Sequence, residues 1–246
     1  MPTQSVQRAM FILKQFSVDE PQLGVSELSR RLGLTKSTVS RLLATLRDGG
    51  LVVQDPTNRQ YRLGLGLVEL SNSLISGRGL TKIVPPYLRH LSDAVGEFSL
   101  LALRKEDVVI PVLRSPGPPR LRPVEWVASA PLHCTATGKI FLAHMSEEQL
   151  SAFLEPPLSL PATQTSVDPK DLRVELERIQ QQGFATSFGE FLEGENAIAG
   201  PIVRSNGTVF AAMGVAGPAY RFTPERAMAS VDILKAIVRE VSRELE

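Results

Sequence analysis

Apolar residues recur every three or four positions in three successive stretches at the start of the chain, a spacing that predicts three short helices. The second stretch, VSELSRRLGL, has Ser26 as a candidate N-cap and ends at Gly33, as expected for a tight turn between two crossed helices. The third stretch follows Thr35 as its N-cap and stops at Gly49-Gly50. The next segment, LVVQDPTNRQYRLG, predicts two short strands around an Asp-Pro-Thr-Asn turn.

The third helix has two chemically different sides. At about 100° per residue, Val39, Leu42, Leu43 and Leu46 form one apolar stripe. The opposite side carries short hydroxyl side chains and an arginine, whereas a solvated helix usually carries Glu–Lys pairs. Short side chains let a helix approach base edges, and arginine can bind guanine through two hydrogen bonds. Helix, turn, helix and hairpin is the order of a winged helix-turn-helix, so we expect contact with double-stranded DNA. An ordinary amphipathic core helix is the alternative.

The predicted DNA-binding residues lie on this polar side and at the tip of the hairpin. They are Lys36, Ser37, Thr38, Ser40, Arg41, Thr45, Asn58 and Arg59.

Strand and helix patterns mix in the rest of the chain. A helical pattern around Leu67, Leu70 and Leu74 predicts a linker helix and a dimer contact, with a routine core helix as the alternative. Beyond residue 80, FSLLALRKEDVVIPVLRS and AIAGPIVRSNGTVFAAMGVAG predict hairpins, the second with Asn206-Gly207 at its turn. Helical patterns cover LTKIVPPYLRHLSDAVGE, with a break at Pro85-Pro86, and TATGKIFLAHM, SEEQLSAFL, DPKDLRVELERIQQQGF and TPERAMASVDILKAIVREVSRELE. This mixture predicts an α+β fold with an antiparallel sheet flanked by helices.

Composition narrows the class of protein. The 246 residues are 43% hydrophobic and include a single cysteine, Cys134, which fits a reducing compartment. We find no signal peptide and no stretch of about 20 apolar residues, so we expect a soluble cytoplasmic protein without a membrane contact. Residues 1–77 hold nine Lys or Arg and six Asp or Glu, against 18 and 20 in the remainder. A basic N-terminal part fits a nucleic-acid partner.

Enzymatic and metal chemistry find little support in the sequence. The three histidines share no metal-ligand spacing, and one cysteine cannot build a thiolate site, so we expect no metal and no cofactor. His133 and Cys134 are adjacent, and on an extended segment they point to opposite faces, which argues against a nucleophile–base pair. The acids Glu190, Glu193 and Glu195 are expected to be solvated in a loop. No catalytic residue is predicted, and an enzyme with a helical assembly domain is kept only as an alternative.

Two groups of segments carry a family resemblance. VSELSRRLGLTKSTVSRLLATLRDGGLVVQD with YRLG, and then PLHCTATGK, GFATSFGEFLEGENAIAGPI and VFAAMGVAGP, resemble in order and spacing the isocitrate lyase regulator (IclR) family of bacterial transcription factors. The resemblance implies a winged helix-turn-helix over 1–64, a linker helix over 65–79, and a GAF-like effector-binding and oligomerisation domain over 80–246. It also implies homodimers or dimers of dimers, a pseudo-palindromic operator, and control by a small organic acid. Repression is favoured because most family members repress, and activation is the alternative.

The resemblance also indicates where an effector binds. HCTATGK opens a helix with small residues, whose free N–H groups can bind an anion, although Thr135 as a simple cap is the alternative. The family pattern of small keto-acid binders has a cysteine at Ala197, serines at Gly214 and Ala216, and an acid at Ser187. Lost hydrogen-bond partners disfavour a small polar ligand, so we expect a larger carboxylate, for example an aromatic one. The predicted effector-binding residues are Arg122, Trp126, Ala136, Thr137, Ser187, Glu190, Ala197, Gly214 and Ala216.

Overall fold

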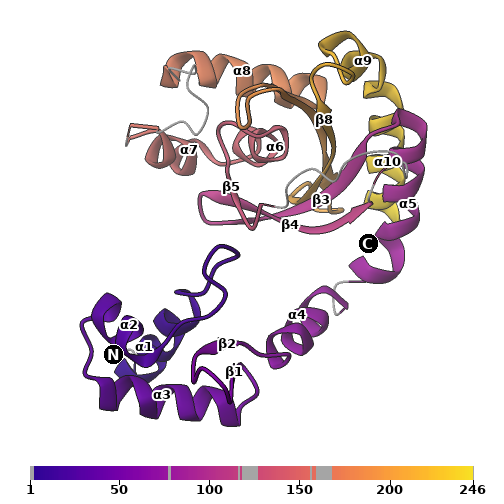
Figure 1. Cartoon of the computed structure of the whole chain (residues 1–246). Helices are drawn as coiled ribbons and strands as arrows, with labels where there is room; N and C mark the ends of the chain where they lie inside the picture. The colour runs from indigo at the N-terminus through magenta and orange to yellow at the C-terminus, as the bar shows by residue number, and fades with distance from the viewer. Residues whose placement is uncertain are drawn as a thin grey trace. The chain divides into compact units, whose positions relative to one another are not determined.

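The computed structural model describes residues 3–76, 79–115, 117, 127–155, 157–158 and 168–245. The chain divides into two compact units, Met1–Gly77 and Arg78–Glu246 (Figure 1). Each unit has its own hydrophobic core. Among the described helices, none combines the length and apolar character that a membrane crossing requires.

The first unit contains three packed helices, a two-stranded hairpin and a fourth helix. Helices α1, α2 and α3 are followed by strands β1 and β2, which pair antiparallel as predicted. Their core consists mainly of aliphatic side chains. The bounds are α1 Gln4–Leu13, α2 Val25–Leu32, α3 Lys36–Asp48, β1 Val52–Gln54, β2 Tyr61–Leu63 and α4 Gly66–Ser76. The fully buried members of this core are Ile12, Leu28, Val39, Leu43 and Val52.

The helix ends in this unit confirm three of the four predicted signals, including the stop of α3 at Gly49. Gly33 ends α2 in the left-handed conformation at φ 63°, and Thr35 caps α3 by accepting a hydrogen bond from the Thr38 N–H. The prediction of Ser26 as N-cap of α2 is wrong. The helix already begins at Val25, because the Leu28 N–H donates to the carbonyl of Gly24, and Gly24 is the N-cap.

The second unit is built on one antiparallel sheet of six strands in the order β5-β4-β3-β8-β7-β6. Both predicted hairpins are present, β3–β4 and β7–β8. Strands β5 and β6 were not predicted, and they extend the sheet at its two edges. The α+β prediction is confirmed. The bounds are β3 Phe98–Lys105, β4 Val108–Ser115, β5 Ala130–Pro131, β6 Ala185–Phe188, β7 Glu195–Val203 and β8 Val209–Pro218.

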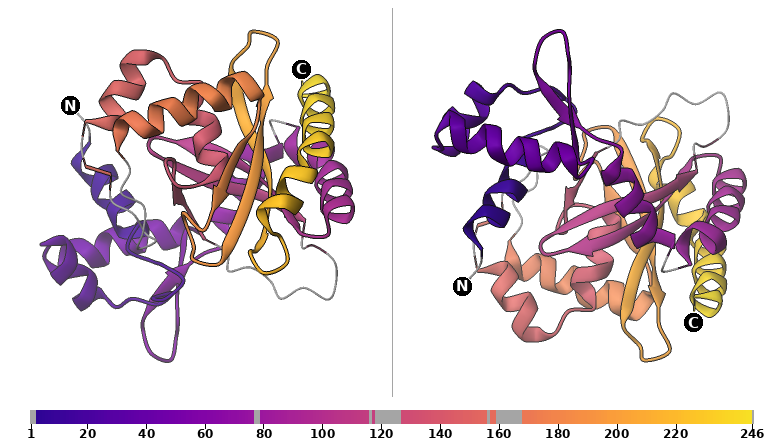
Figure 2. Two further views of the ribbon diagram at one scale, coloured as in Figure 1. Left: turned by 90° about the horizontal axis from the view of Figure 1, so that it is seen from above. Right: turned by 90° about the horizontal axis from the view of Figure 1, so that it is seen from below.

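Helices cover both faces of this sheet (Figure 2). On one face α5 (Leu80–Val95) packs against β3, β4 and α10 (Val231–Glu244). On the other face α6 (Ala136–Ala143) contacts the central strands, and α8 (Pro169–Gln182) lies against α6. All eight residues of α6 are buried, so this short helix is the centre of the layer. The remaining helices are α7 (Glu147–Leu154) and α9 (Pro224–Ala229).

The predicted break at Pro85-Pro86 is wrong, because α5 runs without interruption from Leu80 to Val95. A proline inside a helix removes the N–H that would bond to the residue four positions back. Here Leu80, Val84, Leu88, Leu91 and Val95 form a buried stripe along the whole helix. This packing holds the helical path across the two missing hydrogen bonds.

The C-terminal segment forms two helices rather than the single helix that was predicted. Thr223 caps α9 and Pro224 is its first residue, but Ser230 separates α9 from α10. Helix α10 turns its apolar side, with Leu234, Ile237 and Val241, toward the core.

Candidate nucleic-acid interface and effector pocket

Helix α3 has one buried and one exposed side, as its periodicity predicted. Val39 and Leu43 are completely buried and Leu46 is 7% exposed. The structure brings the six predicted DNA-binding residues of this helix together on the opposite side. Of these, Thr38 is half-buried and the exposed ones are Lys36, Ser37, Ser40, Arg41 and Thr45.

The hydroxyl groups at the start of α3 are connected to one another. Thr35 Oγ1 accepts from the Thr38 N–H at 3.3 Å and lies 3.0 Å from Ser37 Oγ and 2.9 Å from Thr38 Oγ1. Further along, Thr45 Oγ1 donates to the carbonyl of Arg41 at 3.2 Å. The start of α3 therefore presents a small polar surface next to its first free N–H groups, which can donate hydrogen bonds to a phosphate oxygen.

Arginines in this unit fall into two groups. Arg30 and Arg31 form ion pairs with Glu27, and Arg31 also pairs with Glu20. These pairs stabilise the surface of α2. The exposed Arg41 guanidinium forms no ion pair or hydrogen bond with the part of the chain that the structure describes. Its five N–H donors are available to a partner from outside.

The hairpin tip is ordered by its own side chains. Asp55 Oδ1 accepts from the N–H of Thr57 at 2.7 Å and of Asn58 at 3.2 Å. Asn58 accepts from the Gln60 N–H and donates to Gln22 at 3.1 Å, so much of its hydrogen-bonding capacity is used inside the protein. Arg59 adopts φ 61°, and its side chain is exposed.

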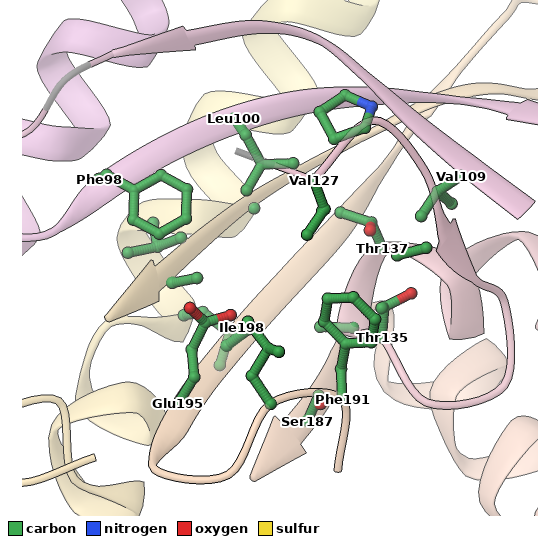
Figure 3. A pocket seen from close by; sticks show the side chains of 18 of the residues that line it. Phe98, Leu100, Val109, Val127, Thr135, Thr137, Ser187, Phe191, Glu195 and Ile198 are labelled. Carbon is green, nitrogen blue, oxygen red and sulfur yellow. The ribbon is translucent and has the colours of Figure 1, made fainter. Parts of the chain in front are cut away.

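A cavity of about 750 Å³, including its part open to solvent, lies between α6 and the sheet in the second unit (Figure 3). Side chains that face each other on neighbouring strands share one face of a sheet. Ser187 pairs with Ala197, Ala197 with Ala216, and Ala216 with Phe98, which forms one row across four strands. All four residues line the cavity.

The next row of the sheet also lines the cavity. Gly214 pairs with Leu100, and Leu100 pairs with Arg114 on β4. A Cβ atom on Gly214 would lie 3.4 Å from Thr137 Cγ2 and 2.7 Å from the carbonyl oxygen of Ile198. The missing side chain at Gly214 thus lets the start of α6 approach the sheet closely.

Six of the nine predicted effector-binding residues are brought together around this cavity. Arg122 and Trp126 lie outside the described residues. Glu190 is absent from the described lining and pairs with a lysine instead. The six lining residues are Ala136, Thr137, Ser187, Ala197, Gly214 and Ala216. Lining residues that the sequence did not predict include Phe98, Leu100, Val109, Arg114, Val127, Phe191, Leu192, Glu195 and Ile198.

The first turn of α6 forms part of the cavity wall. Thr135 caps the helix, accepting from the Gly138 N–H at 3.1 Å and donating to the carbonyl of Pro131 at 2.9 Å. A Cβ atom on Gly138 would lie 2.3 Å from the carbonyl oxygen of Leu132, so only glycine fits there. The first two amides of a helix have no partner inside it, and here they belong to the lining residues Ala136 and Thr137.

Two polar groups beside the cavity, the Ser187 hydroxyl and the Cys134 thiol, have their chemistry set by the protein itself. Ser187 Oγ donates to the carbonyl of Cys134 at 2.9 Å. Burial raises the pKa of the Cys134 thiol to about 12, so the thiol stays protonated near neutral pH and is a poor nucleophile.

A buried lysine ties the loop after β6 to α6 and α8. Lys139 is 1% exposed and its Nζ lies 2.7 Å from Glu175 Oε1, 2.5 Å from Glu190 Oε2 and 3.3 Å from the carbonyl oxygen of Thr186. Burial raises the pKa of Glu190, and the charge of Lys139 opposes that rise. Glu190 directly precedes Phe191 in the chain, so the ion pair positions one wall of the cavity.

Glu195 was expected to be a solvated loop residue, and this expectation is wrong. It begins β7 and its side chain lines the cavity (Figure 3). Burial raises the pKa of its carboxyl group to about 7. A usable signal was present in the sequence, because Glu195 precedes the predicted pocket residue Ala197 by two positions and a strand repeats its face every two residues.

Comparison with known proteins identifies both units. Residues 5–56 match the family model of the IclR helix-turn-helix domain, and residues 72–243 match that of the bacterial transcriptional regulator IclR C-terminal. The HTH-type transcriptional repressor AllR of Escherichia coli K12 is 30% identical over 98% of this chain and 90% of its own length. The HTH-type transcriptional regulator KdgR of the same strain is 28% identical over 95% of this chain and 92% of its own length.

Solved structures agree with these relatives. An IclR homologue from Microbacterium hydrocarbonoxydans complexed with 4-hydroxybenzoate superposes with a TM-score of 0.85 at 25% identity, covering 98% of this chain and 99% of the homologue. An IclR regulator from Alicyclobacillus acidocaldarius shares the fold with a TM-score of 0.89 over both complete chains at 24% identity. The helix-turn-helix unit, the helix-flanked antiparallel sheet and the family matches lead to the same conclusion: this chain is a transcriptional regulator of the IclR family.

Proposed function

We propose that the chain is a repressor that binds a pseudo-palindromic operator through α3 and is controlled by an organic acid bound between α6 and the sheet. The observation that carries the proposal is the exposed polar side of α3, with the unpaired guanidinium of Arg41 at its centre. The repressor role is supported by the 30% identity to the repressor AllR. Transcriptional activation through the same DNA binding and effector binding is the alternative.

The proposed DNA contacts divide into two kinds. Arg41, with Ser40 and Thr45, reads base edges in the major groove, because these side chains project from the exposed side of α3. Lys36, Ser37 and Thr38, at the start of the helix, contact phosphate groups and fix the orientation. At the hairpin tip, Asn58 and Arg59 contact the DNA backbone or the minor groove.

The proposed effector is an aromatic carboxylic acid. The cavity walls are mainly apolar, which suits a ring, and the free amides of Ala136 and Thr137 suit a carboxylate. The complex of a homologue with 4-hydroxybenzoate supports this class of ligand. We place Ser187, Ala197, Gly214 and Ala216 along the ring, and Glu190 behind the wall, where it supports the loop through Lys139.

The proposed organisation follows the family. Residues 1–64 bind DNA, residues 65–79 form a linker helix and residues 80–246 bind the effector and form the oligomer. A homodimer, or a dimer of dimers, places two α3 helices on half-sites about 34–36 Å apart. Because the operator is bacterial DNA, we place the protein in the cytoplasm. An effector shifts the DNA-binding equilibrium only if it binds the two arrangements with different affinity.

Footprinting of the full chain on the DNA upstream of its own coding region tests this function. We expect one or more protected sites with two-fold symmetric half-sites, and a change in protection when aromatic acids are added. A reporter gene under that promoter decides between repression and activation by the sign of its response. An absence of any sequence-specific protection would refute a DNA-binding role at this promoter.

A further inference from the structure

We propose that Glu195 selects effectors that present a hydrogen-bond donor, such as a ring hydroxyl, at the end opposite their carboxylate, and that it excludes dicarboxylic acids. This inference rests on the proposed function, since it assumes that the cavity holds an organic acid at the start of α6. It specifies the ligand group opposite the carboxylate, which the effector-binding residues predicted from the sequence do not determine.

Glu195 lies on the sheet side of the cavity. It starts β7 and shares a sheet face with Ala197, so its side chain enters the cavity from the sheet side. Thr137 enters from the first turn of α6. In the close view the Glu195 carboxylate and the Thr137 side chain lie on opposite sides of the cavity (Figure 3). A ligand whose acid group is held at the start of α6 therefore extends toward Glu195.

The surroundings of Glu195 offer its carboxylate no compensation. No hydrogen bond or ion pair to its side chain is found among the residues that the structure describes. The cavity walls include Phe98, Phe191 and Ile198, whose side chains cannot donate a hydrogen bond. A carboxylate in such an environment is costly unless it receives a donor, and a ligand in the cavity that Glu195 lines can supply one.

The basic residue of the described lining does not occupy this position. Arg114 lies on β4, whereas Glu195 is on β7, and strands β3 and β8 separate the two in the sheet. Arg114 belongs to the row of Leu100 and Gly214, whereas Glu195 belongs to the row of Pro218. These two rows lie two rows apart along the strands. The cation thus lines a different corner of the cavity.

The charge of Glu195 determines which ligands the cavity favours and which it disfavours. Burial raises the pKa of Glu195 to about 7, so at pH 8 most of the group is ionised. A ligand hydroxyl then donates to the carboxylate, and a hydrogen bond to a charged group is stronger than one between neutral groups. A second ligand carboxylate would face Glu195 across a mainly apolar part of the cavity, where two like charges repel.

Isothermal titration of the full chain at pH 8 tests the inference with three probes that share one ring: 4-hydroxybenzoate, benzoate and terephthalate. We expect 4-hydroxybenzoate to bind about tenfold more tightly than benzoate, and terephthalate to bind more weakly than benzoate. In Glu195→Gln the penalty on terephthalate disappears, because the repulsion is gone. Glu193→Gln is the matched control, since Glu193 is exposed two residues away and should leave all three affinities unchanged.

Each outcome decides a different point. Equal affinities for 4-hydroxybenzoate and terephthalate in the wild type would overturn the role of Glu195. An unchanged penalty on terephthalate relative to benzoate in Glu195→Gln would do the same. Both results would leave the proposed effector class intact. Failure of all three acids to bind would overturn the proposed aromatic acid effector, and this inference with it. A cooperative unfolding transition of Glu195→Gln without ligand shows that the variant is folded.

Discussion

Helices α3 and α6 begin with the same device and work in opposite surroundings. Each has a threonine N-cap that accepts from the N–H three residues later. Yet α3 buries one stripe and exposes most of its polar side, whereas all eight residues of α6 are buried. The exposed side of α3 contributes little to stability, so its chemistry is free to serve a partner. In α6 the residues that line the cavity also hold the core, so binding and stability cannot be changed separately.

The largest effect is expected at Lys139, behind the cavity. Lys139→Met leaves Glu175 and Glu190 facing each other without their common cation. Breaking a buried ion pair costs about 3–5 kcal/mol, and we expect the lower end because both carboxylates are partly exposed. Urea denaturation followed by circular dichroism measures this loss. Lys170→Met, at the exposed start of α8, is the control.

The pH dependence of the Lys139→Met variant provides a second test. Without the cation the pKa of Glu190 rises further, so protonation relieves the variant as the pH falls. The deficit relative to the wild type should therefore be smaller at pH 5 than at pH 8. A deficit no larger than that of Lys170→Met at either pH would show that the ion pair does not hold the loop.

Glu195 should make the stability of the second unit depend on pH. Its folded pKa of about 7 exceeds the ordinary value of 4.5, so the folded state binds more protons between these values. Stability therefore falls as the pH rises from about 4.5 to 7, and levels off above that. Glu195→Gln removes this slope and should be more stable than the wild type at pH 8 by about 2–3 kcal/mol. Denaturation at pH 4.5 and pH 8 measures it, and equal differences at both pH values would contradict the assignment.

The difference between the two helices also explains what the sequence could predict. The two sides of α3 follow from a local period of 3.6 residues, so the positions of Lys36 and Arg41 were correctly placed on its exposed side. The β7–β8 hairpin followed from Asn206-Gly207 for the same local reason. Local signals failed at Pro85-Pro86, where tertiary packing overrides the proline.

The cavity could be predicted only in part, because its walls depend on strand register. Phe98 lies beside Ala216, and Ala216 lies beside Ala197, through pairing that joins β3 to strands distant in the sequence. No local pattern contains that information. The family resemblance supplied six lining residues, but it did not supply Glu195, whose environment is created by burial among the mainly apolar side chains of the cavity.

On α3 the comparison predicts a loss of binding without a loss of stability. Arg41→Ala removes donors that make no contact inside the described protein, so the melting temperature should not change. Operator affinity should fall by about 1–3 kcal/mol in gel-shift titrations. Arg41→Lys is the matched variant: it keeps the charge and loses the bidentate geometry, so a base contact is not restored by it. Full affinity in Arg41→Lys would reduce the role of Arg41 to a phosphate contact.

The smallest loss of stability is expected when the two N-cap threonines, Thr35 and Thr135, are replaced. Thr35→Ala leaves the Thr38 N–H without its side-chain acceptor, but water can replace it at this exposed position, so the cost should be about 1 kcal/mol. Thr135→Ala also breaks the bond to the carbonyl of Pro131, in a partly buried site, which should raise the cost to about 2 kcal/mol. Hydrogen exchange resolved along the full chain assigns each loss to its own helix. Equal protection losses in α3 and α6 would mean that burial does not distinguish the two helices, and the separation of binding from stability in α3 would lose its physical basis.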